Sequence, residues 1–109
     1  MKKYQMGEFE EVVILTVAVL NNKAYSVAIK DEIEARLPRA VSMGALHSAL
    51  IRLEDKGYLR SFPGEATADR AGRPRMYFEI TAAGKKAVQF AKESRDSLWK
   101  AIPKAILNT

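Results

Sequence analysis

Three arginines near one another are the residues of this chain best suited to bind a polyanion. Arg70, Arg73 and Arg75 occur in and just beyond the segment 63–74, which is rich in Gly, Pro and Ala. A guanidinium group can bind phosphate, and arginine at a hairpin tip favours a narrow minor groove of DNA. The alternative is a solvated loop that carries charge for solubility. The segment therefore predicts either a basic loop that contacts DNA or an ordinary surface loop.

A second group of candidate residues lies on one side of a helix that we expect to begin at Ser42, a good N-cap type. Leu46, Leu50 and Leu53 recur at four- and three-residue spacing, so they share the face that packs into the core. The opposite face then carries Met43, Gly44, His47, Ser48 and Arg52.

The side chains on this second face are of types that contact nucleic acid. His47 and Ser48 can hydrogen-bond base edges or phosphates, and Arg52 can reach a phosphate or a guanine. Gly44 lets the backbone come close to DNA. Two alternatives stay open: Met43 can fill the core at the start of the helix, and His47 can be a surface histidine without a specific partner. The role of this face depends on the elements around it.

The neighbouring elements follow the order of a winged helix-turn-helix. Gly57 can take the left-handed conformation that closes a helix, and Tyr58–Phe62 and Met76–Ile80 are strand candidates on either side of the arginine-rich segment. A preceding helix should run from Ser26 to about Arg36 and stop before Pro38. The short connection to the next helix is what a helix-turn-helix needs. The apolar face of the preceding helix is predicted to contain Val27, Ile29, Ile33 and Leu37.

The segment Val12–Leu20 is apolar throughout, and its periodicity fits a buried strand or a helix equally well. Three glutamates precede it, where acids suit a helix N-terminus, and two asparagines follow it, a residue type tolerated at a helix C-cap. We therefore expect a helix. Tyr25 and Ser26, at the start of the following helix, are candidates for phosphate contact through their hydroxyl groups and the helix N-terminus.

The last helix should begin after Thr81 and run toward Ile102, because Pro103 discourages further helix. So long a helix has more apolar surface than so small a domain can bury, so its surplus should pair with a second chain. Packing only on its own helices is the alternative. Phe90 and Trp99 could line a flat apolar slot between subunits, although dimer packing explains aromatic residues equally simply. The predicted dimerisation stripe consists of Val88, Ala91, Leu98, Trp99 and Ile102.

Four segments together resemble the PadR family of bacterial transcriptional regulators. They are Gly7–Leu20, Ala24–Glu34, Val41–Leu59 and Arg70–Gly84, within residues 6–102. The most specific part is S-x-G-x-L-x-x-x-L-x-x-L-E-x-K-G-Y combined with R-x-G-R-x-R-x-Y-x-x-T-x-x-G at this spacing. Many family members have Tyr where this chain has His47, so the local contact there can differ.

The resemblance implies a mainly α (α+β) fold, a winged helix-turn-helix with a C-terminal dimerisation helix. Residues 1–81 would form the DNA-binding part, and residues 82–109 the dimerisation helix and tail of one compact domain. It also implies a homodimeric repressor that releases double-stranded DNA when a small molecule binds, here a small aromatic or phenolic effector. The alternative function is that of a winged-helix module for protein interaction, which would not need the arginine-rich loop.

The composition narrows the function classes further. A chain of 109 residues with 48% hydrophobic residues is expected to form one domain. Its net charge of +5 favours nucleic acid or an anionic membrane surface, or marks a merely soluble basic protein. With no Cys and one His, thiolate chemistry and a multi-histidine metal site within one chain are excluded. The adjacent acid pairs Glu10–Glu11 and Glu54–Asp55 diverge on helices, so we expect no enzyme, metal or cofactor.

The N-terminus lacks a signal-peptide pattern, and the longest apolar run is too short to span a bilayer. The sequence therefore predicts a soluble cytoplasmic protein without a membrane partner.

Overall fold

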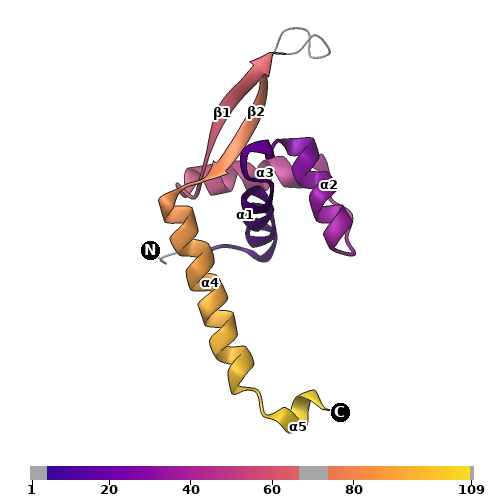
Figure 1. Ribbon diagram of the computed structural model, residues 1–109, viewed down its shortest axis with the longest axis vertical. Helices are drawn as coiled ribbons and strands as arrows, with labels where there is room; N and C mark the ends of the chain where they lie inside the picture. The colour runs from indigo at the N-terminus through magenta and orange to yellow at the C-terminus, as the bar shows by residue number, and fades with distance from the viewer. Residues whose placement is uncertain (1–4, 67–73, 109) are drawn as a thin grey trace.

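The computed structural model describes residues 5–66 and 74–108. Its elements follow the order α1 (Glu8–Leu20), a 3-10 turn (Asn21–Lys23), α2 (Ser26–Arg36), α3 (Met43–Asp55), β1 (Leu59–Ala66), β2 (Pro74–Ile80), α4 (Ala82–Ala101) and α5 (Lys104–Leu107). Helices α1, α2 and α3 pack together, the two strands form a long hairpin beside them, and α4 runs away from this body (Figure 1). The fold is therefore the predicted winged helix-turn-helix with a C-terminal helix.

The apolar segment near the N-terminus is a helix, as predicted. The carboxylate of Glu10 accepts a hydrogen bond from the N-cap Gly7 nitrogen at 2.7 Å, which satisfies a free donor at the start of α1. Asn21 ends the helix with a φ of 54°. Between these ends, Val13, Ile14 and Val17 are fully buried, so α1 forms the centre of the core.

Helix α2 ends before Pro38, and a hydrogen bond joins its last turns to the connection that leads into α3. The Glu34 carboxylate accepts a hydrogen bond from the Val41 nitrogen at 2.8 Å, and this bond lowers the pKa of Glu34, with Lys30 adding to the effect. The prediction of a four-residue apolar face was wrong for two positions. Ile29 and Ile33 are buried one turn apart, but Val27 is 52% exposed and Leu37 is 38% exposed. Leu37 lies beyond the helix end in extended backbone, which turns its side chain out of the helical stripe.

The hairpin is longer than the two predicted strands. The antiparallel register pairs Leu59 with Ile80 and Pro63 with Met76, and it shifts between Pro63 and Ala66. Pro63 is tolerated because β1 has only one neighbouring strand. The Phe78 nitrogen donates to the Ala24 carbonyl at 2.8 Å, so the backbone itself anchors the hairpin at the start of α2.

Helix α4 packs into the core only at its beginning, and an ion pair from Arg95 to Glu11 of α1 holds it further along. The hydroxyl of Thr81, its N-cap, accepts from the Gly84 nitrogen at 3.0 Å and donates to the Gly57 carbonyl at 2.6 Å. A Cβ at Gly84 would lie 2.2 Å from the Tyr58 carbonyl oxygen, so only glycine permits this close packing. Within α4 only Gly84 and Ala87 are buried. The rest of the helix extends beyond the core (Figure 1).

Candidate nucleic-acid interface

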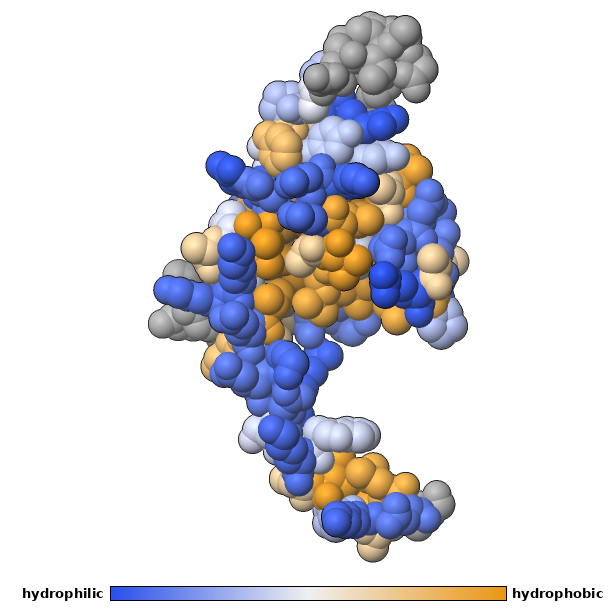
Figure 2. Space-filling view, in the orientation of Figure 1, coloured by the Kyte–Doolittle hydropathy of each residue, from blue (hydrophilic) through white to orange (hydrophobic). Residues whose placement is uncertain are grey.

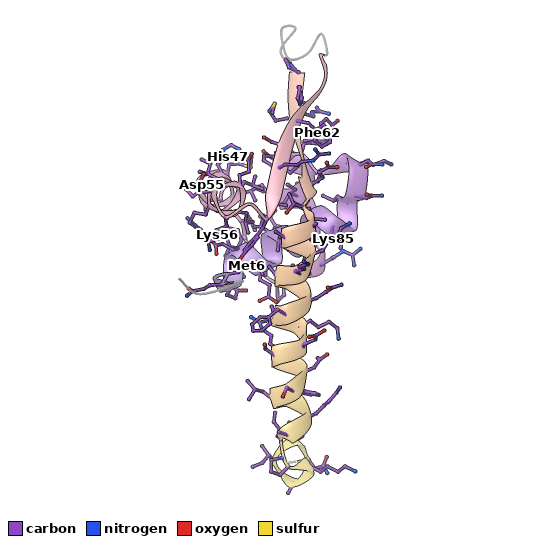
Figure 3. The ribbon with its side chains drawn as sticks, turned by 90° about the vertical axis from the view of Figure 1, so that its left-hand side faces the viewer. Met6, His47, Asp55, Lys56, Phe62 and Lys85 are labelled. Atoms are coloured by element: carbon purple, nitrogen blue, oxygen red, sulfur yellow. The ribbon has the colours of Figure 1, made fainter. Side chains whose placement is uncertain are left out.

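Helix α3 presents one buried face and one exposed face. Ser42 caps it by accepting a hydrogen bond from the Ala45 nitrogen at 3.1 Å. Leu46, Ala49, Leu50 and Leu53 are buried, as the leucine spacing predicted, whereas the exposed face carries Gly44, His47, Ser48, Ile51 and Asp55. Figure 3 shows α3 nearly end-on, with His47 and Lys56 on different sides of the helix. The exposed polar face is free to meet a partner.

Gly44 lies on this exposed face, and packing does not require a glycine at this position. A Cβ at this position would meet no atom within 4 Å. A glycine in a helix costs about 0.5–1 kcal/mol relative to alanine, so the fold gains nothing from it. Its position agrees with the prediction that the backbone of α3 comes close to DNA here, and that role stays a prediction.

The structure brings four predicted DNA-binding residues together around one surface pocket, which we call the junction pocket. Tyr25 and Ser26 come from the start of α2, His47 comes from α3 and Arg75 comes from β2. The His47 Nε2 atom lies 3.3 Å from the Ser26 hydroxyl oxygen. The pocket has a volume of about 410 Å3 and is also lined by Val27, Met76 and Phe78. The junction pocket therefore lies where the helix-turn-helix meets the hairpin.

Arg75 does not lie free at a loop tip. Its guanidinium group stacks over the Tyr25 ring, 4.2 Å from the ring centre. Its Nε atom is buried and has no hydrogen-bond partner among the described residues. The charge is therefore held in place beside the start of α2, where it can face a phosphate. Arg70 and Arg73 lie outside the described residues.

An aromatic cluster sets the position of the hairpin. The Tyr77 ring meets the Tyr25 ring edge-on at 5.6 Å and stacks on Phe62, its cross-strand partner, at 6.0 Å. A Cβ at Gly64 would lie 2.3 Å from a Tyr77 ring atom, so glycine makes room for that ring. Because Tyr25 precedes α2, this cluster holds the hairpin and the start of α2 as one surface.

Arg52, which the helical face placed toward DNA, is bound within the protein. The buried Glu10 carboxylate accepts from Arg52 Nε at 2.8 Å and from Lys56 Nζ at 2.7 Å. Figure 3 shows Lys56 pointing toward Met6, next to the start of α1. Burial raises the pKa of the Glu10 carboxyl. The hydrogen bonds from Lys56, Gly7 and Arg52 lower the pKa by more than burial raises it, so the pKa is about 2. Sequence spacing alone could not show this, because Glu10 is 42 residues from Arg52 and 46 residues from Lys56 in the chain.

Two other residues of α3 differ from the sequence expectation. Met43 is partly buried against the core, so the alternative of core filling is the one the geometry favours. Ile51 is not among the predicted site residues, yet it is 59% exposed between the polar positions of the same face. Its spacing of four residues from His47 and three from Ser48 was the available signal.

The predicted dimerisation stripe is largely uncovered in a single chain. Leu98 is 73% exposed and Trp99 is 61% exposed, whereas Val88 and Ala91 are half-buried. Figure 2 shows a broad hydrophobic area over α1 beside α4, and a second one at α5. Leu15 and Val19 are the exposed large apolar residues of α1. The two helices are linked by an ion pair between Glu11 and Arg95 at 2.6 Å.

Phe90 and Trp99 do not meet within one chain. Nine residues of helix separate them, which is two and a half turns, so they project from opposite sides of α4. A slot that uses both residues therefore needs more than one chain.

Comparison with known proteins identifies the family. Residues 14–90 match the transcriptional regulator PadR-like family. Among curated proteins, none matches this chain. The chain is similar to the structure of a PadR-like transcription factor from Bacteroides fragilis, with 29% identity over 84% of each chain and a TM-score of 0.68.

Two further structures share the fold. A transcriptional regulator from Clostridium thermocellum is 25% identical over 92% of this chain and 97% of its own, with a TM-score of 0.70. A PadR-like transcriptional regulator from Bacillus cereus is 16% identical over 93% and 92%, with a TM-score of 0.73. The family match spans most of the helix-turn-helix, the hairpin and the start of α4. The chain therefore belongs to the PadR-like family of transcriptional regulators, which bind DNA.

Proposed function

We propose that this protein is a homodimeric, sequence-specific repressor that binds double-stranded DNA through α3, the start of α2 and the hairpin. The observation that carries the proposal is the junction pocket, where Ser26, His47 and Arg75 meet beside the exposed face of α3. Phosphate-binding groups and base-reading groups thereby lie on one continuous surface. DNA as the partner places the working protein in the cytoplasm.

In the proposed complex, α3 enters the major groove and reads base edges with His47 and Ser48. Gly44 lets the backbone of α3 approach the DNA. The hydroxyl groups of Tyr25 and Ser26, together with the N-terminus of α2, meet a backbone phosphate. Arg75 supplies positive charge to the same strand, and we propose that Arg70 and Arg73 add to that charge. Arg52, a further predicted contact, is bound by Glu10 through Nε, so we assign it a smaller share of this contact.

The shape of the chain supports a dimer. Its radius of gyration is 16.3 Å, whereas a compact chain of this length has a value of about 13 Å. The excess reflects α4, which extends from the body with an apolar stripe exposed (Figure 1). In the proposal, residues 1–81 bind DNA, and residues 82–109 pair with a second chain. A two-fold dimer would place two copies of α3 about 34 Å apart and read a pseudo-palindrome.

A small aromatic or phenolic effector is the proposed signal for release. Trp99 is the only tryptophan of the chain and lies exposed on the proposed dimer stripe. Two copies brought together by a two-fold axis would present flat apolar surface to such a compound. Quenching of tryptophan fluorescence by planar aromatic compounds, with loss of DNA binding over the same concentrations, would support this step.

The DNA contact is tested by selecting fragments from a random-sequence pool with the purified protein. We expect steeply salt-dependent binding and one recurring sequence. His47→Ala and Ser48→Ala should each lower discrimination between selected and random DNA, by about 1–3 kcal/mol where the side chain makes a bidentate pair of hydrogen bonds to a base. Ser97→Ala on α4 is the matched control, because Ser97 is exposed and lies off the dimerisation stripe, and it should change neither affinity.

Equal loss of affinity for both DNA types would make His47 and Ser48 phosphate contacts instead of base readers. The second candidate function, a winged-helix module for protein interaction, would be supported by the absence of salt-dependent DNA binding at low ionic strength.

A further inference from the structure

Ile51 is an exposed apolar residue on the face of α3 that the proposed function turns toward DNA. Its side chain is 59% exposed, although its neighbours Leu50 and Leu53 are buried. The core therefore does not use it. The stripe proposed for dimerisation lies on α4, beside exposed residues of α1, whereas Ile51 belongs to α3. Neither folding nor the proposed pairing accounts for this residue.

The position of Ile51 on α3 places it in line with the proposed base readers. It follows His47 by four residues and Ser48 by three, and such spacings put side chains next to one another on a helix. Helical side chains also lean toward the N-terminus, so Ile51 leans toward the two polar residues. The three side chains form one patch that fits a few neighbouring base pairs.

The charges around Ile51 argue against a role in phosphate binding. The next residue, Arg52, is drawn to the buried Glu10 carboxylate at 2.8 Å, and Lys56 is bound by the same carboxylate at 2.7 Å. The exposed residue one turn further along is Asp55, an acid. This part of the helix therefore offers a methyl-rich surface with its nearby cations engaged elsewhere.

We propose that Ile51 reads thymine by packing against the C5-methyl group in the major groove. That methyl group is the apolar feature of a base edge there, and it distinguishes thymine from the other bases. A β-branched side chain is stiff in a helix, so Ile51 loses little freedom when it packs. The inference rests on the proposed function, and it adds a specificity determinant to it.

The test is a double-mutant cycle, in which the methyl group is removed from the DNA, the Ile51 side chain is shortened in the protein, or both changes are made together. The DNA is the fragment selected from the random pool, prepared once with thymine and once with uracil, which lacks only the methyl group. Affinities are measured for the wild type and for Ile51→Ala at one salt concentration. Single thymine-to-uracil replacements then locate the contacted base pair.

For the wild type we expect affinity to fall roughly 4-fold for each contacted methyl group that is removed, on the scale of one buried carbon unit. Ile51→Ala should bind the thymine DNA more weakly by a similar factor and should be indifferent to uracil. Leu37→Ala, which also shortens an exposed apolar side chain, is the matched control and should keep the wild-type preference for thymine. Circular dichroism should show both variants folded, because alanine favours the helix at position 51.

A wild type that binds uracil and thymine DNA equally overturns the proposal. It is also overturned if Ile51→Ala keeps the full preference for thymine, because the methyl group is then sensed by another residue or through DNA shape. Failure to select any DNA would reject the proposed function and this inference together. Selection of a sequence without thymine sensitivity rejects the inference alone.

Discussion

At the scale of single residues, a glycine in the first turn of α3 and a glycine in the first turn of α4 differ in whether packing requires them. Gly84 is required by packing, because a Cβ there would lie 2.2 Å from the Tyr58 carbonyl oxygen. Gly44 is not required, because the same atom would meet nothing within 4 Å. A glycine that the fold does not need, on the exposed face of α3, agrees with the proposed close approach of DNA there.

Gly44→Ala should therefore stabilise the fold and weaken DNA binding. Alanine favours the helix by about 0.5–1 kcal/mol, and its methyl group would occupy space that we assign to the DNA backbone or a base edge. Thermal unfolding and DNA titration check the two effects separately. Gly84→Ala is the contrasting variant and should unfold at a markedly lower temperature. A Gly44→Ala protein with unchanged DNA affinity would show that α3 does not approach DNA at this position.

At the scale of elements, Glu10 joins the first turn of α1 to the end of α3. Its carboxylate is buried and accepts hydrogen bonds from Gly7, Arg52 and Lys56. The joint ties the end of α3 to α1 and gives two cations a partner within the protein. Its strength depends on the charge of one carboxylate, so it is sensitive to acid.

Glu10→Gln should destabilise the protein at pH 7 by roughly 2–3 kcal/mol, an amount moderated by the partial exposure of Arg52 and Lys56. Because folding lowers the Glu10 pKa from 4.5 to about 2, its contribution is full above pH 4.5 and is lost as the pH falls toward 2. The gap between wild type and variant should close over that range in urea unfolding. Glu8→Gln, in the same turn but exposed with Arg39, should cost at most about 1 kcal/mol. A gap that does not change with pH would contradict this account.

The hairpin is the second element whose placement matters for DNA. Its aromatic cluster holds Arg75 against Tyr25 at the start of α2. Arg75→Ala should weaken binding to every DNA sequence and reduce the slope of log affinity against log salt by about 0.9 for each phosphate that the variant no longer neutralises. Arg36→Ala removes the same charge at the far end of α2 and should leave the slope nearly unchanged. Equal slopes for wild type and Arg75→Ala would remove Arg75 from the interface.

At the scale of the whole molecule, α4 is the element whose apolar residues remain exposed in a single chain. Only its first turns are buried, and its apolar residues continue outward to Leu98 and Ile102. Among the described residues, no helix is both long enough and apolar enough to cross a bilayer. A second copy of the chain is the partner that we propose for this surface.

Leu98→Asp combined with Ile102→Asp should give a folded monomer that binds its operator weakly, because each charge would be buried without a partner in the dimer. The winged-helix core lies elsewhere, so the far-UV circular dichroism should largely survive. Ser97→Asp with Ala101→Asp adds the same charges at the same spacing about 100° around the α4 axis from Leu98 and Ile102, and this control should remain dimeric. Light scattering at micromolar concentration distinguishes the monomer expected for the first variant from the dimer expected for the control. A Leu98 and Ile102 variant that stays dimeric would move the interface, with α1 as the next candidate.

The sequence by itself determined the main elements and their order, but the expectation that Pro103 discourages further helix was wrong, because α5 begins at Lys104. The spacing of Leu46, Leu50 and Leu53, the Ser42 and Thr81 caps and the positive φ of Gly57 were all predicted and are all present. These features depend on neighbours within a few residues, so periodicity and capping chemistry suffice to find them. The resemblance to the PadR family, carried by two spaced motifs, was confirmed.

Only the tertiary structure decided which charged and apolar side chains remain available to a partner. Arg52 and Arg75 have similar charges in the sequence, but Glu10 holds one and Tyr25 positions the other beside a pocket. Val27 was predicted on an apolar face, yet it is exposed, and so is Ile51, which the sequence did not single out. The physical reason is that ion pairs and burial depend on segments far apart in the chain meeting in space, as Glu11 and Arg95 do. Helical or strand periodicity contains no information about those meetings.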